Sequence, residues 1–281
     1  MKENHNLEKL QEIATRLRLQ VVDMIAPSGQ GYVQQGLGAA DIFTSLYFAE
    51  ATMDPSNPTW EDRDRIFLTT AHNTAIFYAT LAERGFFPVS ELSTYVNDGS
   101  KLEINSSERM GAFVEATCGS LGQGLSVAIG CALSAKRQGR SSRYYVILGD
   151  GEMQEGQIWE AAMYAAHHRI DNVVSFVDCN GQQIDGSTDD VMSLGDLEAK
   201  WKAFGWRVLT CNGHDFEDLG RVISEADAAR GSGIPTVVLM RTDMGRGVDF
   251  MEGTHHWHGI APNDEQLANA LAQLPETLGD Y

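Results

Sequence analysis

Apolar residues recur along the chain in two rhythms, one typical of amphipathic helices and one of short buried strands. A first helix is indicated by apolar residues at helical spacing, ended by Pro27-Ser28-Gly29: Leu7, Leu10, Ile13, Leu17, Val21 and Met24. Further helices are expected at about Gly38–Ala49, His72–Gly85, Ser120–Gly139, Gln157–Arg169, 194–204, 215–230 and 263–274. Buried strands are expected at Ile66–Thr69, Tyr144–Leu148, Val173–Val177, 206–210 and Val237–Met240, with a long loop at 97–118.

This alternation of strands and helices predicts the fold class. We expect an α/β fold whose mostly parallel sheet is covered by helices on both faces. No internal repeat or low-complexity linker divides the sequence, so we expect a single domain over residues 1–281. Ligands of such sheets bind beyond the carboxyl ends of the strands, and candidate chemistry is therefore sought there.

Two polar motifs follow two of these strands and are joined by a predicted helix. Residues 148–152 (Leu-Gly-Asp-Gly-Glu) end one strand, and residues 177–182 (Val-Asp-Cys-Asn-Gly-Gln) end the next. Asp150 offers a carboxylate oxygen, Asn180 an amide oxygen and Gln182 a backbone carbonyl. An all-oxygen set favours Mg²⁺ or Ca²⁺ over zinc.

The glycines of the first motif suit a phosphate group. Gly149 and Gly151 let the backbone approach an anion closely, and the N-terminus of the helix that follows favours negative charge. A Gly-Asp-Gly turn alone would be weak evidence. Combined with Asn180 after the next strand, it predicts a site for a cation and a diphosphate.

The composition narrows the function classes. The 281 residues carry a formal net charge of −18, with 43% hydrophobic residues, which predicts an acidic globular protein. A nucleic-acid partner is not expected because no basic run is present. We expect no membrane span and no signal peptide, and hence a cytoplasmic location. The cysteines form no Cys-x-x-Cys pair, but Cys118 and Cys179 adjoin motif residues and are candidates to line a cofactor cavity.

Both motifs resemble those of a known family. Residues 149–162 (Gly-Asp-Gly-Glu-Met-Gln-Glu-Gly-Gln-Ile-Trp-Glu-Ala-Ala) and 178–186 resemble the thiamine diphosphate motif of transketolases. Four more segments resemble other parts of that family: 119–126, 204–206, 213–215 and 257–262. The resemblance implies the family's diphosphate-binding (PP) domain, bound thiamine diphosphate with Mg²⁺ or Ca²⁺, and transfer of a two-carbon ketol unit from a ketose to an aldehyde.

The resemblance covers only the N-terminal domain of the family. Full-length transketolases continue with a pyrimidine-binding domain, which holds the catalytic glutamate, and a C-terminal domain. The chain therefore resembles the N-terminal subunit of a split transketolase. This implies a second subunit with the pyrimidine-binding domain, an α2β2 heterotetramer and sugar or aldehyde substrates.

The resemblance also implies residue roles. The metal ligands would be Asp150, Asn180 and the carbonyl of Gln182. Cofactor contacts are implied for His72, Gly119, Leu121, Gly149, Gly151, Glu152, Asn180 and His255. Catalytic roles are implied for His72, His255, His258, Glu155 and Glu160, the two glutamates at a subunit interface.

Several of these residues also have an ordinary structural interpretation. Glu160 suits a solvated helix face, and His72 suits a helix cap. The histidines at 255–258 do not predict a metal cluster, because adjacent histidines point apart in an extended loop. His5 and His214 are expected at the surface or in turns.

Two positions depart from the family pattern. Where transketolases have Ser-Gly-His-Pro-Gly, this chain has Ser-Gly-Gln-Gly-Tyr at 28–32, and Asn105 takes the place of a second histidine. By resemblance, Gln30, Asn105 and His258 face the substrate. A neutral amide forms hydrogen bonds but is no acid or base near neutral pH. The departures therefore predict an intact cofactor site with an altered donor or acceptor.

Two other functions stay open at this point. One is the α subunit of a thiamine diphosphate-dependent 2-oxo acid decarboxylase, dehydrogenase or carboligase, which shares the cofactor motif. The loss of two sugar-contacting histidines keeps it open, whereas segments 119–124 and 257–259 favour transketolase. The other is a degenerate subunit kept as a scaffold, and the intact Asp150 and Asn180 argue against it.

Overall fold

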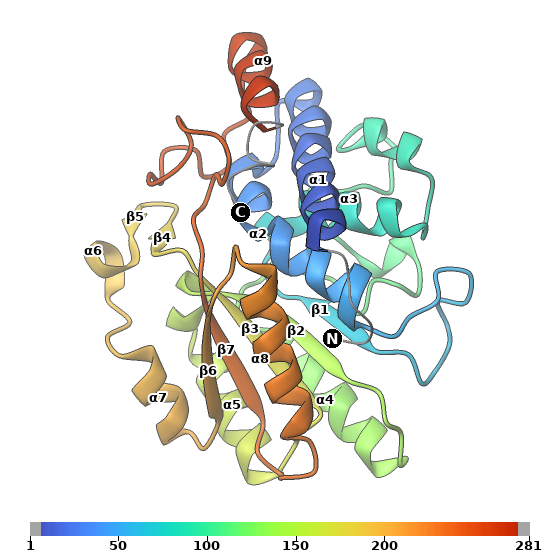
Figure 1. Cartoon of the computed structure of the whole chain (residues 1–281), viewed down its shortest axis with the longest axis vertical. Helices are drawn as coiled ribbons and strands as arrows, with labels where there is room; N and C mark the ends of the chain where they lie inside the picture. Colours follow the sequence, from blue (N-terminus) through green and yellow to red (C-terminus); the bar gives the residue numbers. More distant parts are fainter. Residues whose placement is uncertain (1–6, 275–281) are drawn as a thin grey trace.

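Figure 1 shows the computed structural model, which describes residues 7–274, with a central sheet between layers of helices. The sheet has five parallel strands in the order β1-β2-β3-β7-β6. Their bounds are β1 (Arg65–Leu68), β2 (Tyr144–Gly149), β3 (Val173–Cys179), β6 (Arg207–Asn212) and β7 (Thr236–Arg241). The predicted α/β class and the five predicted strands are confirmed, and the single domain over 1–281 stays a prediction.

Alternate residues of the strands feed two separate cores, as the two-residue period of a strand requires. In β2, Tyr145 and Ile147 belong to one core, and Tyr144, Val146 and Leu148 to the other. The first core is covered by α1 (Leu7–Ser28), α2 (Val33–Thr44), α3 (Thr74–Arg84), α8 (Phe216–Ala228) and α9 (Asp264–Gln273). The second is covered by α4 (Gly124–Arg137), α5 (Gly156–His167) and α7 (Leu197–Ala203). Helices thus cover both faces, as predicted.

The end of α1 is confirmed within the predicted segment Pro27-Ser28-Gly29, whereas the start of α2 differs from the prediction. α1 ends at Ser28, and Gly29 then adopts a φ of +64°, its N–H donating to the carbonyls of Ile25 and Ala26. α2 begins at Val33, five residues before the expected start, and continues as a π-helical turn, η1 (Ser45–Glu50).

Several short elements were not predicted, because they lack enough residues to show a period. They are the 3₁₀ turns η2 (Ala71–Asn73), η3 (Val89–Thr94), η4 (Glu108–Met110) and η5 (Gly151–Gln154), the helix α6 (Thr188–Met192), and a hairpin of β4 (Gln182–Gln183) with β5 (Gly186–Ser187). No helix within residues 7–274 is long and apolar enough to cross a membrane.

A buried charged network ties α1 and α2 to the β6–α8 turn. Arg18 Nη2 bonds Asp41 Oδ2 at 2.6 Å, and His214 Nδ1 lies 2.8 Å from the same oxygen. The Asp243 N–H donates to His214 Nε2, so Nδ1 carries the ring proton and donates to Asp41. His214 lies in a turn, one of the two predicted settings, but it is 6% exposed and so does not lie at the surface, since it serves as the partner of a buried carboxylate. His5 lies outside the described residues.

Candidate active site

A cavity of about 430 Å³ lies at the carboxyl ends of β1, β2 and β3. It is in this region of a parallel sheet that ligands are expected. Twelve of the sequence-predicted site residues line it: His72, Asn105, Gly119, Leu121, Gly149, Asp150, Gly151, Glu152, Glu155, Asn180, Gln182 and His258. The fold therefore brings segments that are far apart in the sequence together at the carboxyl ends of the strands.

Asp150 lies at the end of β2, and both of its carboxylate oxygens are fixed by the backbone. Oδ1 accepts the Gly151 N–H and Oδ2 accepts the Gly181 N–H, each at 2.7 Å. Burial, with Asp178 nearby, raises the pKa of this carboxyl to about 7. Burial disfavours the charged form of this carboxyl, and a bound cation would stabilise that form. Asp150 is therefore suited to be a metal ligand.

The other predicted ligands extend from the end of β3 into the β4–β5 hairpin. Asn180 Oδ1 accepts the Gln182 N–H at 3.0 Å, and Gln182 pairs with Ser187 in the hairpin. Gln154 of η5 holds this hairpin, donating to Gln183 Oε1 at 2.7 Å and to the Met192 carbonyl at 2.9 Å. Residues 7–274 contain no group of three or more His, Cys, Asp or Glu suited to a metal. A metal here would therefore need the amide and carbonyl oxygens as well as Asp150.

The glycines of the motif keep the backbone accessible. A Cβ on Gly149 would lie 3.3 Å from Thr70 Cγ2 and 3.8 Å from the His72 ring. A Cβ on Gly151 would meet the Gln183 side chain at 3.5 Å. The segment after Gly151 is the short turn η5, and the longer helix α5 begins only at Gly156. The expected helix N-terminus is therefore separated from the motif by one 3₁₀ turn.

Glu152 is buried, and its carboxylate connects three walls of the cavity. Oε2 accepts the Thr69 hydroxyl at 2.6 Å and the Gly149 N–H at 3.2 Å, while Oε1 accepts the Gly122 N–H at 2.7 Å. Burial raises the pKa of Glu152, although these donors act in the opposite direction. In this geometry Glu152 fixes the ends of β1 and β2 and the turn before α4 relative to one another.

Three rings form the wall of the cavity contributed by the N-terminal half and the C-terminal loop. His72, Tyr32 and His258 have centroids 5.7 to 6.2 Å apart. Burial and the proximity of His258 lower the pKa of His72 to about 3. Burial also lowers the pKa of His258. Both imidazoles are therefore neutral near pH 7 and act as hydrogen-bonding groups.

Similarity to known proteins assigns this architecture to a family. Residues 9–276 match the family model of the transketolase thiamine diphosphate binding domain. The chain belongs to the transketolase family. It is 38% identical over 265 residues to the 6-deoxy-6-sulfo-D-fructose transketolase subunit of a Clostridium species, covering 94% of this chain and 96% of that one. It is 35% identical to a subunit of the apulose-4-phosphate transketolase of Actinobacillus succinogenes, covering 97% of this chain and 98% of that one.

Solved transketolases share the fold over part of their length. The transketolase of Campylobacter jejuni superposes with a TM-score of 0.90 at 29% identity, covering 96% of this chain and 43% of that one. The transketolase of Leishmania mexicana superposes with a TM-score of 0.88 at 29% identity, covering 95% and 41%. This member of the transketolase family thus spans less than half of those solved chains and nearly all of the separate subunits.

Three predicted site residues lie away from the cavity of this transketolase-family chain. Gln30 is exposed beyond the end of α1, and His255 is half-buried with its ring beside that of His256. Glu160 is exposed on α5 and lines a groove between α4 and α5. Cys118 and Cys179 are free thiols, and neither lines the cavity. Tyr32 and Met244 also line the cavity and were not predicted as site residues: Tyr32 ends the segment 28–32 that departs from the family motif, and Met244 belongs to no recognised motif.

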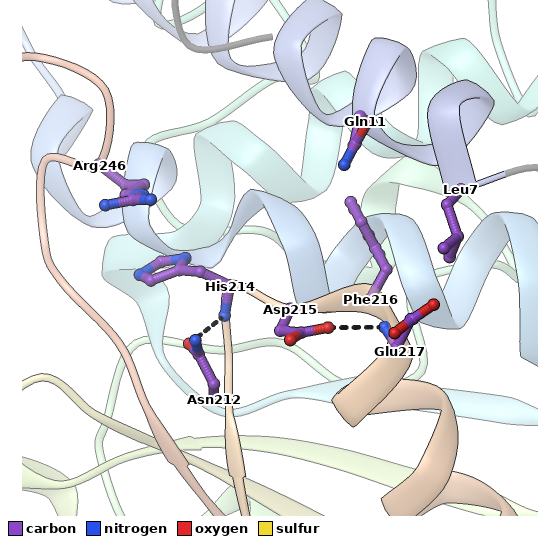
Figure 2. Close-up of a pocket in the computed structure, with 8 residues that line it drawn as sticks. All are labelled: Leu7, Gln11, Asn212, His214, Asp215, Phe216, Glu217 and Arg246. Atoms are coloured by element: carbon purple, nitrogen blue, oxygen red, sulfur yellow. Dashed lines mark hydrogen bonds between the residues drawn. The ribbon is translucent and has the colours of Figure 1, made fainter. Parts of the chain in front are cut away.

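A second cavity of about 410 Å³ lies between α1 and the β6–α8 turn, and Figure 2 shows Leu7 and Gln11 above that turn. The Asn212 side chain accepts the His214 N–H at 3.0 Å, and Asp215 accepts the Glu217 N–H at 2.9 Å. These side chains hold the turn that begins α8. Apart from His255, the predicted metal and cofactor residues line the first cavity, and none of them lines this second one.

Proposed function

We propose that this chain is the diphosphate-binding subunit of a two-chain transketolase that binds thiamine diphosphate with Mg²⁺ and transfers a two-carbon ketol unit from a ketose to an aldehyde. The observation that carries the proposal is the convergence of Asp150, Asn180 and Gln182 at one cavity. Support comes from the near-complete match to subunits of other transketolases.

The residues present fit a hard cation beside a diphosphate. Asp150 and Asn180 offer side-chain oxygens and Gln182 a carbonyl, the donors that Mg²⁺ and Ca²⁺ favour. No Lys or Arg is among the described residues that line the cavity. Neutralisation of a diphosphate within this chain therefore falls to the metal, because the Gly149 and Gly151 N–H groups already donate to Glu152 and Asp150.

Four residues of the cavity, Asp150, Glu152, His72 and His258, have a stated task in this proposal. Asp150 holds the metal, and Glu152 holds the walls around the cofactor. His72 and His258, both neutral near pH 7, position substrate or diphosphate oxygens by hydrogen bonds. Bound thiamine diphosphate supplies the electron sink that allows the C2–C3 bond of a ketose to break.

We propose that a second polypeptide completes the site and that two copies of each chain form an α2β2 heterotetramer. A groove between α4 and α5 supports contact between copies of this chain, because Glu160 and Tyr164 line it and the same two helices carry the exposed Val127 and Met163. Met163 is 59% exposed and Tyr164 45%, and clustered exposed apolar side chains mark interaction surfaces. Roles for Glu155 and Glu160 at this interface stay predictions, as does the cytoplasmic location.

The experiment compares the purified chain, its partner and the reconstituted pair, each with thiamine diphosphate and Mg²⁺. Ketol transfer from xylulose 5-phosphate, fructose 6-phosphate and a panel of other ketoses is measured with aldehyde acceptors. The proposal expects transfer by the pair alone. Full activity of the single chain, or release of CO₂ from pyruvate without ketol transfer, would contradict it.

A further inference from the structure

The loop after α1 directs Tyr32, and not Gln30, into the cavity. Gln30 is exposed, and its backbone N–H and carbonyl bond the Ser28 hydroxyl. Gly31 then turns the chain with a φ of +138°, and a Cβ there would lie 3.0 Å from both Ile25 Cγ1 and Tyr95 Oη. The chain can therefore pass close to Ile25 and Tyr95 only with glycine at position 31, and Tyr32 lines the cavity.

The ring of Tyr32 is held between structural neighbours. It packs edge-on to His258, with centroids 5.7 Å apart and an interplanar angle of 86°. It is tilted by 60° to His72 at 6.2 Å. Behind it, a Cβ on Gly259 would lie 3.2 Å from Tyr32 Cε1, so the C-terminal loop closes directly onto the ring. Such edge-on aromatic pairs have a preferred geometry and restrict the ring.

The chemistry of this wall is neutral and hydrogen-bonding. Within residues 7–274 the Tyr32 hydroxyl has no hydrogen-bond partner. The described lining of the cavity contains no Lys or Arg that could pair with a phosphate or sulfonate of the substrate. A phenol beside two neutral imidazoles suits the hydroxyl groups of an uncharged carbon chain and offers no charge to a phosphate or sulfonate.

We propose that Tyr32 is a specificity-determining residue that contacts the hydroxyl-bearing, uncharged end of the ketose substrate, in the place predicted for Gln30. This inference rests on the proposed function. Under this proposal, a phosphate or sulfonate on the substrate is recognised by residues outside the wall formed by Tyr32, His72 and His258.

The test uses the reconstituted two-chain complex with thiamine diphosphate and Mg²⁺, and the variants Tyr32→Phe, Tyr32→Ala and Gln30→Ala. The donor KM and kcat are measured, together with the Kd for the cofactor by quenching of tryptophan fluorescence. Loss of one hydroxyl contact in Tyr32→Phe is expected to raise the donor KM about tenfold. The cofactor Kd is expected to stay within about twofold of the wild type, because Tyr32→Phe keeps the ring. Gln30→Ala tests the competing prediction that Gln30 faces the substrate, and its donor KM is expected to change less than that of Tyr32→Phe. Gln138→Ala, at an exposed glutamine just after α4, is the control and should leave the donor KM unchanged.

Wild-type KM values in both Tyr32 variants would overturn the inference, as would an increase in KM for Gln30→Ala as large as that for Tyr32→Phe. So would a parallel rise in cofactor Kd and donor KM in Tyr32→Phe, because Tyr32 would then only shape the cofactor site. Failure of the proposed function is seen separately, as absence of ketol transfer by the wild-type complex, and it removes this inference as well.

Discussion

Asp150 shows how a single residue can connect the sheet to the chemistry. Its two oxygens hold Gly151 of its own turn and Gly181 of the neighbouring loop. Asp150→Asn removes the charge and replaces one accepting oxygen by an NH₂ donor facing a backbone N–H. We expect it to weaken Mg²⁺-dependent binding of thiamine diphosphate by at least about 100-fold, measured by isothermal titration calorimetry on the complex. Asp98→Asn, an exposed site of the same charge, is the control, and equal binding by the two variants would contradict the role of Asp150.

His72 predicts a dependence of stability on pH. Its pKa in the folded chain is about 3, below the ordinary value of 6.5, so the unfolded chain binds more protons between these values. The contribution of neutral His72 to the free energy of unfolding is therefore fully present above pH 6.5 and is lost as the pH falls toward the pKa of about 3. Between about pH 7.5 and about pH 5.5, the wild type should lose about 1 kcal/mol more unfolding free energy than His72→Gln in urea titrations. An identical loss in both proteins would contradict this account, and the exposed His168→Gln should behave as the wild type.

Residue roles were predictable where a motif fixed them. Asp150, Asn180 and Gln182 were predicted from strand ends and oxygen chemistry, and they do meet at one cavity. Tyr32 was missed because its position depends on the turn at Gly31, which no periodicity reports. The burial of His214 was missed because its partner, Asp41, is distant in the sequence, and a buried hydrogen bond between distant residues leaves no local signal.

At the scale of elements, α4 packs tightly against the end of β1 through Gly124. A Cβ at this position would lie 2.4 Å from Thr69 Cγ2 and 3.2 Å from Thr69 Cα. Gly124→Ala must push the helix away from the strand and should lower the unfolding free energy by about 1–3 kcal/mol. Gly130→Ala in the same helix has no atom within 4 Å of the new Cβ and should raise it by about 0.5–1 kcal/mol. Equal effects in urea unfolding would contradict this packing.

The contact of α1 with α2 depends on a buried ion pair. Arg18 and Asp41 have side chains 1% and 0% exposed. Burial disfavours the charged form of Asp41, yet Arg18 and His214 hold its pKa below the ordinary value. Arg18→Met leaves this carboxylate short of a cation and should cost about 3–5 kcal/mol of unfolding free energy.

Arg16→Met is the matched control on the same helix. Arg16 is 53% exposed in its pair with Glu83, so this change should cost less than about 1 kcal/mol in the same urea titration. A loss as large as that of Arg18→Met would show that burial does not set the strength of these pairs.

Longer elements followed from their periodicity, and short ones did not. Strands β1, β2, β3 and β7 are runs of buried apolar residues, so pattern alone located them. The β4–β5 hairpin has only two residues on each side and is held by Gln154 and by backbone pairing. Its form depends on tertiary contacts, and for this reason the sequence pattern predicted Gln182 as a ligand without predicting the hairpin.

At the scale of the whole molecule, two surfaces of the proposed assembly lie within residues 7–274: the cavity at the strand ends and the apolar groove on α4 and α5. Ile184, which is 62% exposed, lines the cavity, and Tyr164, which is 45% exposed, lines the groove. In the proposed assembly the cavity meets the second polypeptide, while the groove meets another copy of this chain. The proposed cofactor half-site and the proposed partner subunit were predicted from the sequence, whereas these surfaces required the packed structure.

The central claim is that Asp150, Asn180 and Gln182 hold the metal of a thiamine diphosphate site. The most direct measurement is a crystal structure of the two-chain complex with thiamine diphosphate and Mn²⁺, located by anomalous scattering. The account predicts a peak within about 2.0–2.5 Å of an Asp150 carboxylate oxygen, Asn180 Oδ1 and the Gln182 carbonyl, with the diphosphate beside Gly149 and Gly151. A metal peak elsewhere, or a cofactor bound away from this cavity, would contradict it.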